Sequence, residues 1–299
     1  MKAREVLSRA LVEALDRAGE NAADATIDFD ERVHRFRKEV RRARGILRVV
    51  RSGVDDETRQ RLEEMLRSAT AMTSALRDGA VLIDALNSLP LHESAEPARA
   101  RAEAALEASE AVADSARNPE IILSRAAEGV LTVRMVLNSL SLAELGSSDV
   151  ADSFRDLWKR AQRAREDVIC TGDHEDFHAW RKRTKELRYG FEALVESGAN
   201  LGALLRDLKM AARAQGEITD AFILRDALLD VDFTGVEESY EALLYVLEDR
   251  LTLGMRDVVA EFGVPFDIED QRIRRRVRRV LRDGLRRMFD EDDDEDDDD

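Results

Sequence analysis

Residues 174–189, HEDFHAWRKRTKELRY, could support two kinds of chemistry. The first five residues match the H-E-x-x-H pattern, in which two histidines hold a zinc ion and the glutamate serves as general base. The remainder is rich in arginine and lysine, a composition that suits the binding of a polyanion. The rest of the sequence has to decide between a zinc site and an anion site.

A second copy of the basic segment is present, and it lacks the zinc motif. Residues 33–50, VHRFRKEVRRARGILRVV, align with residues 177–194, FHAWRKRTKELRYGFEAL. Downstream, residues 74–86 align with residues 216–228 at nearly the same offset. The chain is therefore interpreted as a duplicated unit of roughly 140 residues, each half forming a small helical bundle.

The feature that repeats is H-x-x-R-K-x-x-[RK]-x-x-R rather than H-E-x-x-H. The residue aligned with His174 is Asp30, so the first copy reads DERVH where the second reads HEDFH. Gly172 and Asp173 also indicate that a helix begins near His174, which places this histidine in the first turn or the cap. We therefore expect no metal site and no cofactor.

The repeated cations share one face of a helix, because residues advance by about 100° each. Apolar residues such as Phe36, Val40 and Leu47 lie near the opposite side, as do Trp180 and Leu187 in the second copy. Each helix is thus predicted to bury one face and present a cationic one. The predicted cationic faces comprise His34, Arg37, Lys38, Arg41 and Arg44, and His178, Arg181, Lys182, Lys185 and Arg188.

Three roles remain open for His34 and His178: contact with phosphate, structural packing, and metal binding or phosphoryl transfer. Cations this close lower the pKa of a histidine, and a bound polyanion would reverse that effect. Asp78 and Asp220 also repeat, and they could act in catalysis or, more simply, orient an arginine of the neighbouring basic helix. Since no nucleophile paired with a base and no glycine-rich phosphate loop is found, we do not expect an enzyme.

Two further basic surfaces follow the same helical spacing. The first contains Lys209 and Arg213, and a solvated helix face explains it equally well. The second contains Arg275, Arg279 and Arg282, with few acids nearby to offset them. We predict that both surfaces add to the anion site or border it.

Charge is segregated at the end of the chain. The net charge of −16 includes ten acids in residues 290–299, DEDDDEDDDD. Residues 271–289 hold nine arginines and one acid, Asp283. The acidic tail is either a disordered, solubilising end or a mimic that competes with a polyanionic ligand.

Composition sets the fold class and the compartment. Hydrophobic residues make up 44% and charged residues 37%, and no convincing strand pattern is found, so we predict an all-α protein. Cys170 is the only cysteine, which excludes an internal disulfide. The first 20 residues resemble an amphipathic helix rather than a signal peptide, and no apolar run is long enough to span a membrane. We expect a cytoplasmic protein.

These features together resemble the CHAD domain, the conserved histidine α-helical domain. The resemblance rests on VHRFRKEVRRAR, SALRD, FHAWRKRTKELRY and GEITD, and it covers about residues 1–289. It implies two four-helix bundles related by a pseudo-twofold axis, residues 1–148 and 149–289, followed by the tail at 290–299. It also implies that the basic helices face a shared groove or pore that binds inorganic polyphosphate. Ile218 and Thr219 depart from the family pattern, which prefers Leu and Asn there.

A different class of function is the alternative. A helical adaptor that docks an acidic protein or nucleic acid would also present basic faces. Nucleic acid is the less favoured partner, because aromatic residues make up only 5% and do not alternate with the basic ones. Arginine greatly outnumbers lysine in the chain, and its forked donors suit phosphate oxygens.

Overall fold

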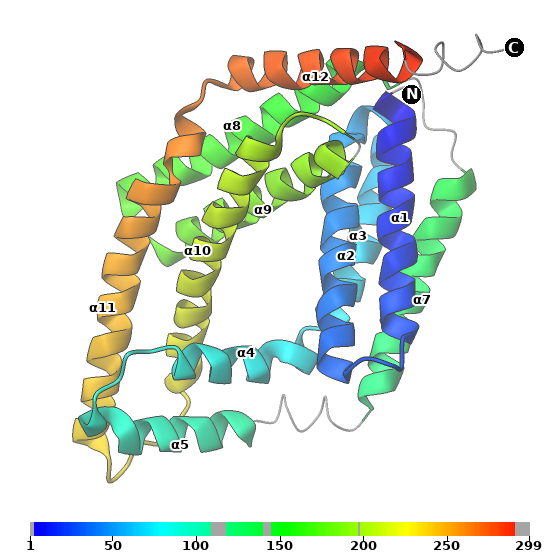
Figure 1. The fold of residues 1–299 in the computed structure, drawn as a ribbon. Helices are drawn as coiled ribbons and strands as arrows, with labels where there is room; N and C mark the ends of the chain where they lie inside the picture. Colours follow the sequence, from blue (N-terminus) through cyan, green and yellow to red (C-terminus); the bar gives the residue numbers. More distant parts are fainter. Residues whose placement is uncertain (1–2, 109–117, 140–144, 197, 291–299) are drawn as a thin grey trace, which may run out of the picture.

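The computed structural model describes residues 3–108, 118–139, 145–196 and 198–290, apart from the side chains of residues 3–4, 75, 77–80 and 283–290. These residues form α-helices joined by turns and 3₁₀ helices, and they contain no strand, which confirms the all-α prediction (Figure 1). The first helices are α1 (Ala3–Ala23), α2 (Phe29–Val49), α3 (Asp56–Met72), α4 (Ala75–Asn87), α5 (Glu96–Glu107) and α7 (Pro119–Ser139). The later ones are α8 (Ser147–Thr171), α9 (His174–Glu196), α10 (Gly202–Leu228), α11 (Glu237–Phe262) and α12 (Asp270–Asp290).

Local capping sets where the two basic helices begin. Asp28 caps α2 by accepting a hydrogen bond from the backbone N–H two residues on. Gly172 ends α8 with φ of 64°, a conformation that glycine adopts without steric cost. The Asp173 carboxylate then accepts from Glu175 N at 3.0 Å, so that α9 begins at His174, as the sequence predicted.

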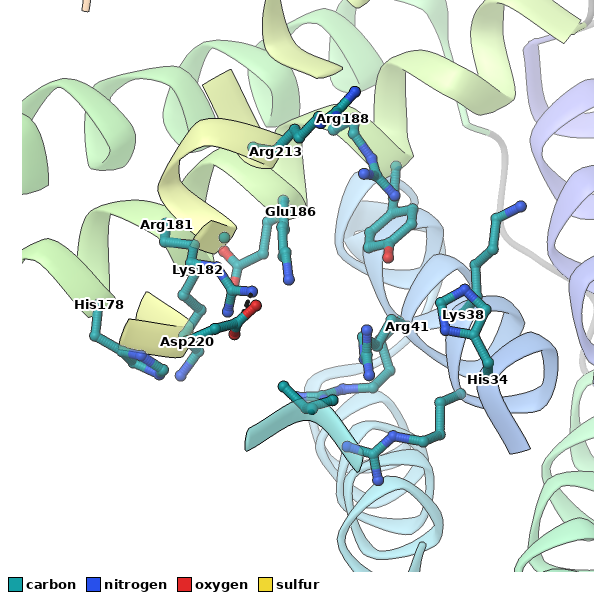
Figure 2. A pocket seen from close by; sticks show the side chains of 18 of the residues that line it. His34, Lys38, Arg41, His178, Arg181, Lys182, Glu186, Arg188, Arg213 and Asp220 are labelled. Atoms are coloured by element: carbon teal, nitrogen blue, oxygen red, sulfur yellow. Dashed lines mark ion pairs between the residues drawn. The ribbon is translucent and has the colours of Figure 1, made fainter. Parts of the chain in front are cut away.

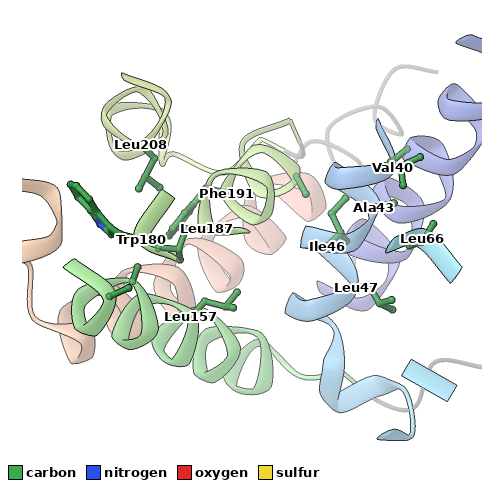
Figure 3. Close-up of a cluster of buried hydrophobic side chains, with 14 of the residues drawn as sticks. Val40, Ala43, Ile46, Leu47, Leu66, Leu157, Trp180, Leu187, Phe191 and Leu208 are labelled. Atoms are coloured by element: carbon green, nitrogen blue, oxygen red, sulfur yellow. The ribbon is translucent and has the colours of Figure 1, made fainter. Parts of the chain in front are cut away.

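The apolar faces of α2 and α9 form the core of their respective sides of the molecule. Phe36, Val40 and Leu47 of α2 are fully buried, and so are Trp180 and Leu187 of α9. Figure 3 shows Val40 and Leu47 on α2, and Trp180 and Leu187 on α9. Each such side chain contributes about 1.5–3 kcal/mol on burial. Because this burial fixes the rotation of both helices, their cationic faces must point the other way, as the helical spacing predicted.

Packing between helices defines two groups that meet at α2 and α9. Helix α2 packs on α1 and α3, and α7 packs on α1 and α3. In the other group α9 packs on α8 and α10, with α12 against α8 and α11 against α10. The groups meet where α2 packs directly on α9.

Helices α4 and α5 cross from the first half of the chain to the second. Helix α4 packs on α10 as well as α2, and α5 packs on α11 (Figure 1). The two halves are therefore interleaved, a feature that the repeat in the sequence does not reveal. The expected boundary between residues 148 and 149 falls in the first turn of α8.

Two other expectations concern the ends and surfaces of the chain. None of the described helices is long and apolar enough to cross a membrane. Of the acidic tail, only Asp290 belongs to α12, and residues 291–299 lie outside the described residues.

Candidate anion-binding site

A cavity of about 1240 Å³ lies between α2, α4, α9 and α10. Its basic lining comes from both copies of the repeated motif and from α10 (Figure 2). The cations that line it are His34, Arg37, Lys38, Arg41, Arg44, Arg48, His178, Arg181, Lys182, Lys185, Arg188 and Arg213. Four acids, Asp84, Glu186, Glu217 and Asp220, offset ten arginines and lysines.

Every residue of the two predicted cationic faces thus reaches one cavity. Figure 2 shows the α2 side chains, including Arg41, and the α9 side chains, including Arg181, on opposite sides of a shared space. Of the other predicted residues, Arg213 and Asp220 also line it. Asp78 lies in α4, but its side chain is outside the described part of the structure.

Lys209 does not line the cavity. It lies one turn before Arg213 on α10, and its ammonium is 3.4 Å from the Glu192 carboxylate. The side chain of Lys209 is half exposed. The helical spacing grouped the two residues correctly on α10, but the cavity ends before it reaches Lys209.

Arg275, Arg279 and Arg282 also lie outside the lining. Helix α12 packs on α8, which contributes no lining residue either. The buried side of α12 is apolar, and the three arginines point to solvent. The three arginines therefore do not line the cavity, because α12 packs on α8, a contact that the sequence did not reveal.

Some of the cavity arginines are held in place by partners on neighbouring helices. Arg37 Nη1 donates to the carbonyl of Thr70 at 2.8 Å and to the Thr73 hydroxyl at 3.2 Å, which ties α2 to the end of α3. Arg48 Nη1 lies 2.8 Å from the Glu186 carboxylate and so joins α2 to α9. Such contacts fix the guanidinium positions before any ligand arrives.

Asp220 lies next to Arg181 of the neighbouring basic helix, in the arrangement that the orienting role predicts. Its carboxylate lies 3.8 Å from Arg181 Nη2, across from α10 to α9. Thr219, one of the departures from the family pattern, is buried and donates its hydroxyl to the Gln215 carbonyl at 2.8 Å. Threonine at this position thus has its hydroxyl donor satisfied within α10, next to the cavity.

Several cations in the cavity have no charged partner. Arg41, Lys182 and Lys185 form no ion pair with any described carboxylate. The Nε–H groups of Arg44, Arg181 and Arg188 are buried and find no acceptor among the described atoms. The side chains of Arg41, Lys182 and Lys185 therefore leave donors in the cavity for a ligand rich in oxygen.

Burial and neighbouring cations both lower the pKa of basic groups in the cavity. Burial lowers the pKa of Lys185 to about 6, with further lowering by Arg181, Arg41 and Arg188. Burial also lowers the pKa of His178, and Arg181 adds to the effect. For His178 this is the expected direction, although burial rather than like charge is the larger cause.

Comparison with known proteins agrees with this architecture. A sequence model of the CHAD domain matches residues 9–229. The chain belongs to the CHAD domain family. Among solved structures, the crystal structure of the CHAD domain from the plant Ricinus communis is similar, with a TM-score of 0.55 at 18% identity, covering 84% of this chain and 91% of that one. At this identity the likeness concerns the fold. A comparison with curated proteins finds no match.

The CHAD match places the cavity within the family region and leaves α12 outside it. Helices α2, α4, α9 and α10 lie within residues 9–229, whereas α11 and α12 follow them. The sequence match thus carries no information about the arginines of α12.

Sequence reasoning missed several polar residues of the cavity. Arg48 lies one turn beyond Arg44 on the predicted face, so the same spacing extended by four residues would have found it. Asp84 lies in the aligned segment 74–86 on α4, but the alignment did not indicate that α4 packs on α10 and brings this carboxylate to the cavity. Glu186 aligns with Arg42, so the repeat gives no sign of an acid at this position.

The two histidines of the H-E-x-x-H segment lie in different surroundings in this CHAD protein. The ring of His174 lies 4.5 Å from the ring of Phe222, and the residue does not line the cavity. Among the described residues, no group of three or more potential ligands could hold a metal ion. His178, in contrast, belongs to the cavity.

Proposed function

We propose that this protein binds inorganic polyphosphate in the cavity and performs no reaction on it. The observation that carries the proposal is the convergence of cations from α2 and α9 on one cavity, with far fewer acids than bases. A linear polyanion that lies between the two helices would contact both sets at once. The CHAD resemblance points to the same ligand.

The chemistry of the lining supports a phosphate chain over other anions. Polyphosphate carries charge along its whole length, and it offers oxygens without bases to stack. Arginine forks bind such oxygens with two donors each. The aromatic residue in the lining is Tyr189, and its ring already lies beneath the Arg188 guanidinium, 4.5 Å from the ring centre. Among the described residues, the lining therefore offers no uncovered tyrosine, tryptophan or phenylalanine ring on which the bases of a single-stranded nucleic acid could stack.

The proposal includes a pseudo-twofold organisation of the site. Helices α2 and α9 carry the two copies of the motif and pack directly on each other. Asp84 and Asp220 come from α4 and α10, the helices that contain the second aligned segment. Each half would thus supply one basic helix and one neighbouring helix to a common ligand.

Binding without catalysis is the function that the acids of the cavity favour. Glu186 pairs with both Arg48 and Arg183, and Asp220 faces Arg181. These carboxylates hold arginines, which leaves them poorly placed to accept a proton from an attacking water.

A calorimetric titration with long-chain polyphosphate tests the proposal. We expect tight binding to the wild type and a loss of more than about a hundredfold in Arg41→Glu/Arg181→Glu, because each reversal places a carboxylate against phosphate. The matched control is Arg61→Glu/Arg125→Glu, which changes net charge equally on exposed helix faces. Unaltered circular dichroism would verify that each variant folds.

Two results would overturn the proposal. One is undiminished binding by the cavity variant and by its milder form, Arg41→Gln/Arg181→Gln. The other is an equal loss in the control, which would mean that only net charge matters. Duplex DNA added as competitor separates the adaptor alternative, since it should fail to displace polyphosphate from the wild type.

A further inference from the structure

The outer face of α12 forms a second basic surface, which we call the α12 arginine face. Ile273, Val277 and Leu281 are buried on the opposite side of the helix, where α12 packs on α8. This packing fixes the rotation of α12 and turns its basic residues outward. The arginine face consists of the exposed residues Arg272, Arg275, Arg276, Arg279 and Arg282.

These five arginines have no acidic partner among the side chains that the structure describes. Arg274, on the same helix, shows what a neutralised residue looks like: its Nε and Nη2 lie 2.6 and 3.1 Å from the two oxygens of Asp152. None of the five forms an ion pair with a carboxylate of the described residues. Like charges three and four residues apart on a helix repel, so the face is destabilising until an anion covers it.

The α12 arginine face is separate from the cavity. No lining residue comes from α12 or α8, and Figure 1 shows α12 along α8, at the edge of the molecule away from α4. The match to the CHAD family ends at residue 229, before this helix begins. The face therefore needs an explanation of its own.

We propose that residues 291–299 of the same chain dock back along the α12 arginine face. This segment, EDDDEDDDD, consists of nine acids and follows α12 directly. Charge complementarity and position in the chain both favour it over an external anion. Tethering gives a segment this short an effective concentration in the range of about millimolar, without any partner having to be found.

The length of the segment fits the face. Nine extended residues reach about 30 Å. Along α12, the distance from Asp290 back to Arg272 is about 27 Å, at 1.5 Å per residue. With about two residues used for the chain reversal, the tail can run antiparallel to the helix from Arg282 to about Arg275, and the long side chain of Arg272 can extend toward its last carboxylates.

Docking of the tail has a consequence for the choice of ligand. An uncovered row of arginines attracts nucleic acid phosphates without regard to sequence. The tail occupies that row and leaves the cavity, on other helices, open to its own ligand. The tail thus competes with polyanions for α12 and not for the cavity.

A distance measurement between two spin labels tests the docking. The labels are placed at Glu269→Cys, just before α12, and at Asp298→Cys, in a chain whose single native cysteine is removed by Cys170→Ser. A docked tail brings the two sites within about 20 Å, whereas an undocked tail leaves them about 35 Å apart on average. We expect the short distance at about 50 mM salt and the long one at about 1 M salt, because salt screens exposed charges.

A triple substitution identifies the surface that holds the tail. Replacing three arginines of the face by glutamine should release the tail and give the long distance at low salt. Replacing three exposed arginines elsewhere should leave the short distance unchanged. The two sets are Arg275→Gln, Arg279→Gln and Arg282→Gln, and, as the control, Arg61→Gln, Arg125→Gln and Arg256→Gln.

Three outcomes would overturn the proposal. The first is a long distance in the parent chain at low salt. The second is a short distance that survives the triple substitution on α12, which would place the tail elsewhere. The third is a short distance between molecules that each carry one label, which would mean that the tail docks on a second copy. None of these bears on polyphosphate binding in the cavity, which the titration of the Arg41 and Arg181 variants tests separately.

Discussion

At the scale of single residues, Lys185 and His178 show how burial among other cations changes proton binding: the pKa of each is lowered. Both lie on α9, and burial is the largest cause of the lowered pKa of each. Lys185, with a pKa of about 6, is largely neutral at physiological pH. In the free protein the cavity therefore carries less positive charge than its residue types suggest, because Lys185 has released its proton.

Binding of a polyanion should return those protons. Phosphate charges near Lys185 favour the ammonium form, so its pKa is higher in the complex than in the free protein. The complex then holds more protons, and affinity must rise as pH falls toward about 6. The expected slope is up to about tenfold per pH unit for one proton taken up.

Calorimetry in two buffers of different ionisation enthalpy counts the protons. We expect uptake of about one proton by the wild type near neutral pH, and much less by Lys185→Met. His178→Asn should reduce the number of protons taken up by less than Lys185→Met does. Equal uptake by the wild type and Lys185→Met would contradict this role for Lys185.

At the scale of elements, the site depends on how closely α2 approaches α9. A Cβ added to Gly45 on α2 would lie 2.7 Å from the Cβ of Tyr189 on α9, which is too close for contact. Gly190 on α9 is similarly placed against Val49 and Phe154. Absence of a side chain at these two positions allows the basic helices to face one cavity.

Gly45→Ala therefore should separate α2 from α9. We expect the free energy of unfolding to fall by about 1–3 kcal/mol, as in other overpacked cores. Gly129→Ala on α7 is the matched control, because a Cβ there meets nothing within 4 Å. That substitution should stabilise by up to about 1 kcal/mol through helix propensity. Denaturant unfolding measures both, and a neutral Gly45→Ala would show that the two helices can shift apart without loss.

The elements also show how much the sequence could predict. Helical periodicity sufficed to group His34 through Arg44 on one face and His178 through Arg188 on another, because burial of Phe36 and Trp180 fixes the rotation. Periodicity carries no information about which helix packs on which. For that reason the crossing of α4 to α10 and the distance of α12 from the cavity could not be foreseen.

At the scale of the whole molecule, the fold brings basic residues from distant parts of the sequence together in one cavity. The cavity gathers cations from helices more than a hundred residues apart in the sequence, and these helices belong to two interleaved halves. The cavity has a volume of about 1240 Å³, and both copies of the basic motif line it. A ligand that contacts both α2 and α9 would bind the folded state only and raise its stability.

A crystal structure of the protein with a short polyphosphate chain tests the central claim most directly. The account predicts phosphate oxygens within hydrogen-bond distance, about 2.7–3.2 Å, of Arg41 on α2 and of Arg181 on α9 in the same molecule. A chain bound only to α12, or to one of the two helices with the other left empty, would contradict it.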